Sequence, residues 1–255
     1  ECGLNFSPTG INDPKNIKRY ENVIDETYIS NIEGRKLTFS KLLKNIEPYI
    51  HKNTEILEIG SYCGIFGDIV KKSGYDYVGI EPSRWASNYA NEKLKLNVIN
   101  GTLEKNLKNL KKSYDTIVMW DVLEHLQDPF STLKILNKLL SKDGTFCFTT
   151  IDIDTWFPKL TKSKWPWIME MHLYYFSSDS LSSILEKYGF QIVENKPYIH
   201  RVPLKYLFDK LIAIFPNPTL NVIFKFIKKI TPFNPILPVG FGDVRIYICK
   251  KIDLK

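Results

Sequence analysis

The first residues that could do chemistry lie between an expected strand and an expected helix. Gly60 and Gly64 occur in the segment Glu58-Ile-Gly-Ser-Tyr-Cys-Gly64, which begins in the strand expected at 54–59. Glycine in such a turn lets the backbone approach a ligand closely, and N–H groups at the start of a helix can bind the ligand. Glu81 ends the next expected strand, where an acid can accept hydrogen bonds from ribose hydroxyls. The pattern predicts a site for a ligand that contains ribose.

A second group of polar residues follows the apolar run at 115–120. Asp121, Glu124 and His125 form a D-x-x-E-H string there. Carboxylates and an imidazole at this spacing could ligate Mg²⁺ or another divalent ion. They could equally shape a ligand pocket without a metal, so the string leaves two interpretations open.

Two of the four histidines, His125 and His172, are candidates for a general base, because histidine titrates near neutral pH. For each of them the alternative is a structural role in the core or in a loop. Aromatic residues surround His172 in the sequence and could form the wall of a substrate pocket or simply pack in the core. They are Trp165, Trp167, Tyr174, Tyr175 and Phe176.

The order of apolar segments predicts how these residues are positioned. Strands are predicted at 54–59, 77–80, 97–99, 115–120 and 145–150, and helices at 65–73, 85–94 and 129–140. Such alternation predicts a parallel sheet covered on both faces, with the strand C-termini along one edge. Ligands bind outside that edge, so both polar groups are expected to meet there.

The flanking segments add helices and an insertion. Residues 14–50 predict two helices, the second at 37–50, and a helix at 177–188 precedes strands at 190–194 and 243–251. Between those strands lies an apolar insertion, 204–240, with apolar residues at helical spacing and lysines opposite them. It could contact an anionic membrane, a second subunit or its own domain. We expect it to fold back over the strand C-termini and cover His172, because its apolar face must be buried.

Composition limits the partners and the compartment. The net charge is +7, carried mostly by lysines that are spread along the chain, so we expect a solvated surface and no stable nucleic-acid partner. Cys2, Cys63, Cys147 and Cys249 include no C-x-x-C pair, so they form no complete zinc site. We expect reduced thiols and a cytoplasmic protein, peripheral to the membrane if the insertion binds lipid.

Together the motifs resemble the class I S-adenosylmethionine-dependent methyltransferases. The likeness rests on LEIGSYCGIFG, GIEPS, NGTLEKNL, YDTIVMWDVLEHLQDP and SKDGTFCFTT. The chain is similar to the ubiquinone-biosynthesis O-methyltransferases and to methyltransferases of bacterial surface-polysaccharide gene clusters. The resemblance implies a Rossmann-like α/β fold, a doubly wound seven-stranded sheet with an N-terminal helical lid and a C-terminal insertion before the last strand. Its parts would be 1–50 (N-terminal segment and lid helices), 51–203 (core), 204–240 (insertion) and 241–255 (final strand).

The resemblance also implies the roles of individual residues. S-adenosylmethionine would be the cofactor, and the acceptor would be a small molecule or glycan precursor methylated on oxygen. His172, or else His125, would take the proton of the acceptor hydroxyl. Glu81 would bind the ribose, while Glu58 and Trp120 would lie near the methionine end. The implied cofactor-binding residues are Glu58, Gly60, Ser61, Gly64, Glu81, Pro82, Thr102, Leu103, Trp120 and Asp121.

Several points depart from the resemblance or leave it open. Tyr62 stands where the family has its central glycine, and Cys2-Gly3 resembles half of a zinc ribbon. Because metal-free relatives share the D-x-x-E-H string, we expect no metal. A metal-dependent RNA-end 2′-O-methyltransferase is the main alternative. A nicotinamide-dependent oxidoreductase is disfavoured because the strings WDVLEH and NGTLE fit a methyltransferase. A non-catalytic cofactor-binding protein remains the last alternative.

Overall fold

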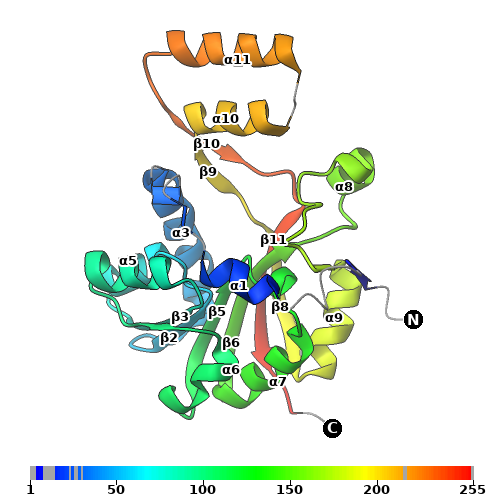
Figure 1. The fold of residues 1–255 in the computed structure, drawn as a ribbon. Helices are drawn as coiled ribbons and strands as arrows, with labels where there is room; N and C mark the ends of the chain where they lie inside the picture. The colour runs from blue at the N-terminus through cyan, green and yellow to red at the C-terminus, as the bar shows by residue number, and fades with distance from the viewer. Residues whose placement is uncertain are drawn as a thin grey trace.

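The structure is a computed structural model that describes residues 4–7, 15–22, 24–25, 28–29, 31–214 and 217–253. The Cys2-Gly3 segment, which resembles half of a zinc ribbon, lies outside these residues. A seven-stranded sheet forms the centre, with the strand order β4-β3-β2-β5-β6-β11-β8 (Figure 1). In this order the strands are Val98–Asn100, Asp76–Glu81, Glu55–Ile59, Tyr114–Trp120, Leu140–Ile151, Val244–Lys251 and Phe190–Pro197.

The direction of the strands matches the predicted doubly wound sheet. Strands β4, β3, β2, β5 and β6 pair in parallel, and β11 pairs antiparallel with both β6 and β8. The chain leaves β2 to one side for β3 and β4 and returns to the other side for β5. The gap between the ends of β2 and β5 is therefore the switch point where ligands of such sheets bind.

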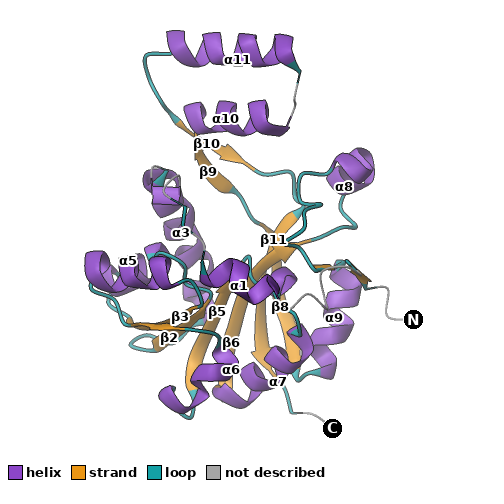
Figure 2. Cartoon of the chain, in the orientation of Figure 1, coloured by secondary structure: helices purple, strands orange, loops and turns teal. Residues whose placement is uncertain are grey.

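Helices cover both faces of the sheet (Figure 2). Consecutive strand residues such as Ile56 and Leu57 belong to opposite cores, because side chains alternate across a strand. One face packs against α3 (Ile32–Ile46), α4 (Ile65–Lys72) and α5 (Arg84–Leu94). The other face packs against α6 (Leu103–Asn106), α7 (Pro129–Leu139) and α9 (Ser178–Lys187). The connections between these strands and helices contain the short helices η1 (Glu47–Tyr49), η2 (Leu107–Asn109), η3 (Leu123–His125), α8 (Trp156–Thr161) and η4 (Lys162–Lys164).

The N-terminal segment contacts the edge of the sheet where the strands end. Strand β1 (Asn5–Phe6) pairs antiparallel with β7 (Tyr174–Tyr175), and α1 (Lys15–Glu21) crosses in front of the sheet (Figure 1). The second predicted helix begins earlier than expected, at Ile32 rather than residue 37, and its last turn is the 3₁₀ helix η1. The two predicted N-terminal helices are therefore present, and their role as a lid stays a prediction.

The insertion differs from the prediction in its position. It is a pair of helices, α10 (Leu204–Ile214) and α11 (Pro218–Ile230), carried by a two-stranded ribbon of β9 (His200–Pro203) and β10 (Ile236–Val239). The ribbon is held against α3, where the Arg201 N–H donates to Thr38 Oγ1 at 2.7 Å. A Cβ on Gly34 would lie 2.4 Å from the Arg201 carbonyl oxygen, so glycine is needed for this close approach.

The prediction that α10 and α11 cover the strand C-termini is wrong. The ribbon directs both helices away from the sheet, and they pack on each other (Figure 1). Paired backbone in β9 and β10 makes the base of the insertion a stiff connection, which the helical spacing of the sequence does not reveal. Within the described residues, no helix has both the length and the apolar character needed to cross a bilayer.

Candidate active site

The glycine loop after β2 has the geometry that a close ligand approach requires. Gly60 and Gly64 adopt φ of 75° and 73°, and the Gly60 N–H donates to the Ile80 carbonyl at 2.8 Å. A Cβ on Gly60 would lie 2.5 Å from Cγ2 of Val122. The loop is therefore held against β3 and against the segment after β5, and only glycine fits at position 60.

Tyr62 replaces the expected glycine without opening the loop. Its φ of 46° is the left-handed conformation that glycine adopts easily and that costs a larger residue free energy. Its ring packs edge-on against Tyr28 at 4.5 Å and Trp85 at 6.1 Å, so aromatic contacts offset the strain. Arg35 lies 3.6 Å above the Tyr28 ring. Tyr28, Trp85 and Arg35 were not predicted at this loop, because only the fold brings them there.

Glu81 connects the end of β3 to the glycine loop. Its two carboxylate oxygens accept hydrogen bonds from the Tyr62 and Ser83 N–H groups, each at 2.7 Å. The side chain is buried, and this burial raises the pKa of Glu81 to about 7, although both backbone hydrogen bonds lower it. A carboxylate fixed beside a glycine loop has the position and the acceptor character needed to bind ribose hydroxyls.

Glu58 is buried beneath the loop, and its predicted contact with the methionine end of the cofactor stays a prediction. The Tyr77 hydroxyl donates to Glu58 Oε2 at 2.5 Å, inside the protein. Burial and, to a smaller extent, nearby Glu81 raise the pKa of Glu58 to about 8, although the hydrogen bond from Tyr77 lowers it. Glu58 thus braces β2 against β3 beneath the loop.

The remaining predicted cofactor residues surround the same edge in different environments. Ser61 is buried in the loop, and Pro82 is half-buried beside Glu81. Thr102 is half-buried directly before α6, whereas Leu103 is only 3% exposed and belongs to the core. Trp120 ends β5, and its buried Nε1 has no hydrogen-bond partner among the described residues.

Asp121 is fixed in an unusual backbone conformation at the end of β5. Its φ is 54°, its N–H donates to Thr149 Oγ1 at 2.9 Å, and that hydroxyl donates to Asp121 Oδ1 at 2.6 Å. Backbone strain of this kind is typical of functional sites when the surroundings hold it in place. The cluster in which ligand atoms of Glu124 and His125 lie within 4.8 Å of one another does not include Asp121.

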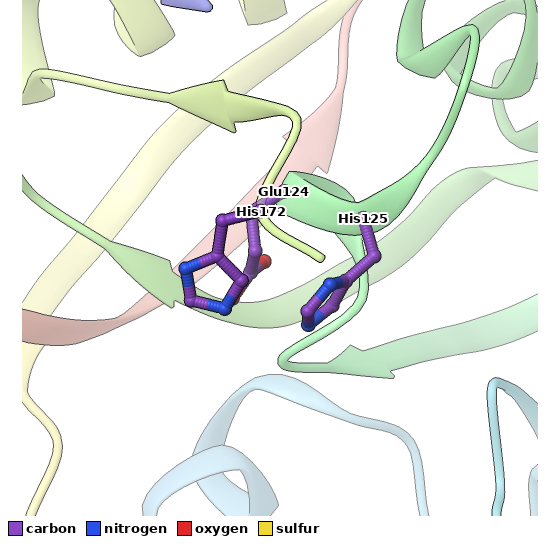
Figure 3. A group of neighbouring side chains, drawn as sticks. All are labelled: Glu124, His125 and His172. Carbon is purple, nitrogen blue, oxygen red and sulfur yellow. The ribbon is translucent and has the colours of Figure 1, made fainter. Parts of the chain in front are cut away.

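His172 takes the place of Asp121 in that cluster. Glu124, His125 and His172 each offer a ligand atom, and these atoms lie within 4.8 Å of one another. Figure 3 shows the two imidazole rings beside the Glu124 carboxylate, although His172 comes from a distant part of the chain. Burial raises the pKa of Glu124 above its usual range, Asp121 raises it further, and Thr150 donates a hydrogen bond at 2.9 Å. The three residues could ligate a divalent ion or serve in proton transfer.

His125 is oriented by its Nδ1 atom. This atom lies 2.7 Å from the Met171 carbonyl oxygen and 2.9 Å from the Tyr20 hydroxyl of α1. Because a carbonyl can only accept, Nδ1 carries the proton, and Nε2 of the neutral ring keeps its lone pair. Burial lowers the pKa of His125 below its usual value. The ring is thus held in the tautomer that a general base needs.

His172 has a more apolar environment. It is 3% exposed, its ring centroid lies 4.6 Å from that of His125, and its Nδ1 has no hydrogen-bond partner among the described residues. Burial, together with His125, lowers the pKa of His172 to about 3. The predicted base therefore lies at the site, but protonation there is strongly disfavoured.

A cavity of about 230 Å³ joins these side chains. It is lined by Asp121, Glu124, His125, Ile151, Trp167, Met169, Met171, His172, His200 and Val244. His200, the first residue of β9, was not predicted at this site, because no motif in the sequence marks the strand that leads into the insertion. The cavity is lined by three histidines, by the Asp121 and Glu124 carboxylates that follow β5 and by apolar side chains, as expected for a small-molecule site.

Only part of the predicted aromatic wall lines this cavity. Trp167 does, and Asp243 holds it by accepting from Trp167 Nε1 at 3.1 Å and from Trp165 Nε1 at 2.7 Å. Trp165, Tyr174 and Phe176 are buried in the core instead. Tyr175 lies beside His172, with ring centroids 6.2 Å apart.

Comparison with known proteins places the chain among methyltransferases. A family model described as a methyltransferase domain matches residues 32–195, more than half of the chain. A ubiquinone biosynthesis O-methyltransferase of Aliivibrio fischeri is 28% identical over 155 residues, which are 55% of this chain and 64% of that protein. A protein of the same name from Vibrio atlanticus is also 28% identical over 155 residues, 55% of this chain and 63% of that protein. The chain thus spans less than two thirds of the length of these curated relatives.

Solved structures share the fold. A SAM-dependent methyltransferase from Archaeoglobus fulgidus superposes with a TM-score of 0.60 at 19% identity, over 89% of this chain and 100% of that chain. Magnesium protoporphyrin IX methyltransferase from Synechocystis, solved with bound SAH, gives a TM-score of 0.54 at 13% identity, over 96% of this chain and 95% of that chain.

Proposed function

The chain belongs to the methyltransferase domain family, and from this premise we propose that it transfers a methyl group from S-adenosylmethionine to a hydroxyl of a small molecule or sugar precursor. The observation that carries the proposal is the cavity beside Asp121, in which His125 keeps its Nε2 lone pair. S-adenosylmethionine is the cofactor of the family, and the chain has the residues to hold it.

The cofactor would be held at the switch point between β2 and β5. Gly60 lets the loop of the site pack closely on Val122, since a Cβ at position 60 would collide with that side chain. Glu81 would accept hydrogen bonds from the ribose, in exchange for part of its bonding to the loop N–H groups. The half-buried Thr102 would contact the adenine, and Asp121, which lines the acceptor cavity, would lie between the cofactor and that cavity.

The protein residues would align the acceptor and take its proton. A bound S-adenosylmethionine supplies an activated methyl group with a neutral thioether as leaving group. His125 Nε2 would accept the proton of the acceptor hydroxyl while the oxygen forms its bond to the methyl carbon. His172, which resists protonation, would face the acceptor as a neutral group. The apolar walls would exclude water and so strengthen these interactions.

Several features support an oxygen acceptor of limited size. A cavity of about 230 Å³ is small among ligand pockets, so it suits one ring bearing a hydroxyl, such as a sugar or a phenol, rather than a polymer chain. The curated relatives are named O-methyltransferases. The resemblance to polysaccharide-cluster enzymes favours a sugar precursor in polysaccharide biosynthesis. The buried free thiols of Cys63, Cys147 and Cys249 are in keeping with a cytoplasmic enzyme.

An assay with methyl-labelled S-adenosylmethionine tests this proposal. Nucleotide sugars and hydroxylated aromatic compounds would be offered in parallel, with a chelator present. We expect labelled product from one of the two classes. Label on a nitrogen-containing acceptor alone, with none of these hydroxyl compounds methylated, would contradict O-methylation.

A second candidate, metal-dependent methylation of RNA ends, is favoured by the cluster of Glu124, His125 and His172. One carboxylate and two neutral imidazoles suit Mn²⁺ or Zn²⁺ better than Mg²⁺, which prefers oxygen ligands. Turnover that a chelator abolishes and Mn²⁺ restores, on RNA but not on small molecules, would replace the main proposal with this one.

A further inference from the structure

The two helices of the insertion form a surface that the proposed reaction does not use. No residue of α11 is buried, and Val222, Ile223, Phe226 and Ile230 are exposed large apolar side chains, with Phe226 at 61%. Phe233, in the loop that follows, is 63% exposed. Exposed apolar groups gathered on one element mark a contact site for another surface.

The exposed apolar side chains lie on the side of α11 that faces away from α10. Phe224 contacts Phe208 of α10, with ring centroids 5.9 Å apart, and Lys228 binds Asp209 of α10. Phe224 and Lys228 are four residues apart and share one side of the helix. Val222, Phe226 and Ile230 form another row with the same spacing, about 160° around the helix from the first. This outer row has no partner among the described residues.

The charges beside the outer row have one sign. Residues 204–230 contain five lysines and a single acid, Asp209, which is already bonded to Lys228. Lys225 and Lys229 are exposed and lie along one border of the outer row, one helical turn apart. A second copy of the chain at this surface would bring like charges together, whereas an anionic surface would neutralise them.

We propose that the outer face of α11 is a peripheral docking site for an anionic lipid membrane. Phe226, Ile230 and Val222 enter the boundary between headgroups and acyl chains, while Lys225 and Lys229 contact the anionic headgroups. A helix of 13 residues is about 20 Å long, so it lies in the plane of the interface rather than crossing the bilayer. In Figure 1 it is the outermost element, held away from the sheet by the β9–β10 ribbon, so the rest of the domain leaves its outer face free.

Vesicle flotation tests the proposal with the full chain. Vesicles of phosphatidylcholine alone are compared with vesicles that also contain phosphatidylglycerol. We expect binding only to the second kind, weakened by salt. Lys225→Gln/Lys229→Gln should weaken it about thirtyfold, since each lysine near an anionic membrane contributes about fivefold. Phe226→Gln/Ile230→Gln should abolish it.

Matched controls separate the surface from general effects of charge and apolarity. Lys134→Gln/Lys138→Gln removes two exposed lysines one turn apart on α7, and Val193→Gln replaces an exposed apolar residue on β8. Both control variants should bind as the parent does, and circular dichroism should show every variant folded. Absence of binding by the parent, or full binding by Phe226→Gln/Ile230→Gln, would overturn the proposal. The proposal would also be overturned if light scattering showed that the parent is a dimer and that Phe226→Gln/Ile230→Gln is a monomer. A second copy of the chain would then cover the outer face of α11.

Discussion

His125 and His172 lie side by side in the cavity but differ in what they can do with a proton. His125 is fixed through Nδ1 by the Met171 carbonyl and keeps a free Nε2. His172 is buried beside it, and its pKa is lowered to about 3, so it gains a proton only at great cost. The sequence favoured His172 as the base because of its place among aromatic residues. We propose His125 for proton transfer instead, with His172 as a neutral neighbour.

Replacing the two histidines separately distinguishes these roles. His125→Gln should lower kcat about 10²- to 10⁴-fold and leave the affinity for S-adenosylhomocysteine nearly unchanged, because the base acts on the acceptor alone. His172→Gln should have the smaller effect on kcat. Since burial lowers the pKa of His125, kcat should fall only below the usual histidine pKa of about 6.5. An equal loss in both variants, or an acidic limb above pH 7, would contradict this assignment.

The titration of Glu81 predicts how cofactor binding depends on pH. Its pKa is raised to about 7 by burial, so the carboxylate loses its charge as the pH falls through this value. S-adenosylhomocysteine should therefore bind more weakly at pH 6 than at pH 8. Glu81→Ala should cost about 1–3 kcal/mol of binding free energy at pH 8, the scale of lost hydrogen bonds to a charged group. In Glu81→Gln the pH dependence should disappear, and its persistence would mean that another group binds the ribose.

At this scale the sequence predicted positions better than environments. Glu81, Gly60 and Gly64 follow strands at a recognisable spacing, so their place at the sheet edge could be predicted. The hydrogen bond between Glu58 and Tyr77 could not be predicted, because it joins two different strands beneath the loop. The bond between Thr149 and Asp121 also depends on neighbouring strands. His172 enters the cluster through tertiary folding over 47 residues of chain.

Among the elements, the wall of the cavity depends on the turn before β11. Asp243 accepts hydrogen bonds from Trp165 and Trp167 and is itself 3% exposed. Asp243→Ala should lower the free energy of unfolding by about 2–4 kcal/mol, because it leaves two indole N–H groups without an acceptor. Asp243→Asn keeps one acceptor oxygen and should cost less. Urea denaturation of the two variants measures the difference, and equal stabilities would show that the indoles find other partners.

The contact from α1 to the site predicts a role for the N-terminal segment in turnover. The Tyr20 hydroxyl lies 2.9 Å from His125 Nδ1, and Tyr20→Phe removes it without changing the ring. We expect kcat to fall about three- to tenfold, the effect of one hydrogen bond, with the cofactor affinity unchanged. Tyr89→Phe, on α5, is the matched control. A loss of cofactor binding in Tyr20→Phe would instead mean that α1 acts on the glycine loop.

The strands and most helices could be predicted from apolar periodicity, since each buries a regular face. The insertion could not be placed in the same way. Its helical spacing correctly predicted helices, but the direction in which they leave the sheet is fixed by β9. That direction depends on the bond between Arg201 and Thr38 and on the space left by Gly34, and neither contact has a local signal.

For the whole molecule, the ribbon connects two surfaces with different chemistry. His200, its first residue, lines the acceptor cavity, and α11 lies at its far end. If α11 docks on a membrane, the short ribbon keeps the cavity close to the lipid surface. The charge of +7 then assists the approach to an anionic bilayer by long-range attraction, in addition to the local lysines.

Calorimetric titration of the intact protein with S-adenosylhomocysteine tests the central claim, that the edge formed by Gly60 and Glu81 binds the methyl-donor cofactor. We predict saturable binding of one molecule per chain at pH 8, weakened in Glu81→Ala, and no heat of binding with NAD. No binding of S-adenosylhomocysteine, together with saturable binding of NAD, would contradict the account and return the chain to the oxidoreductase alternative.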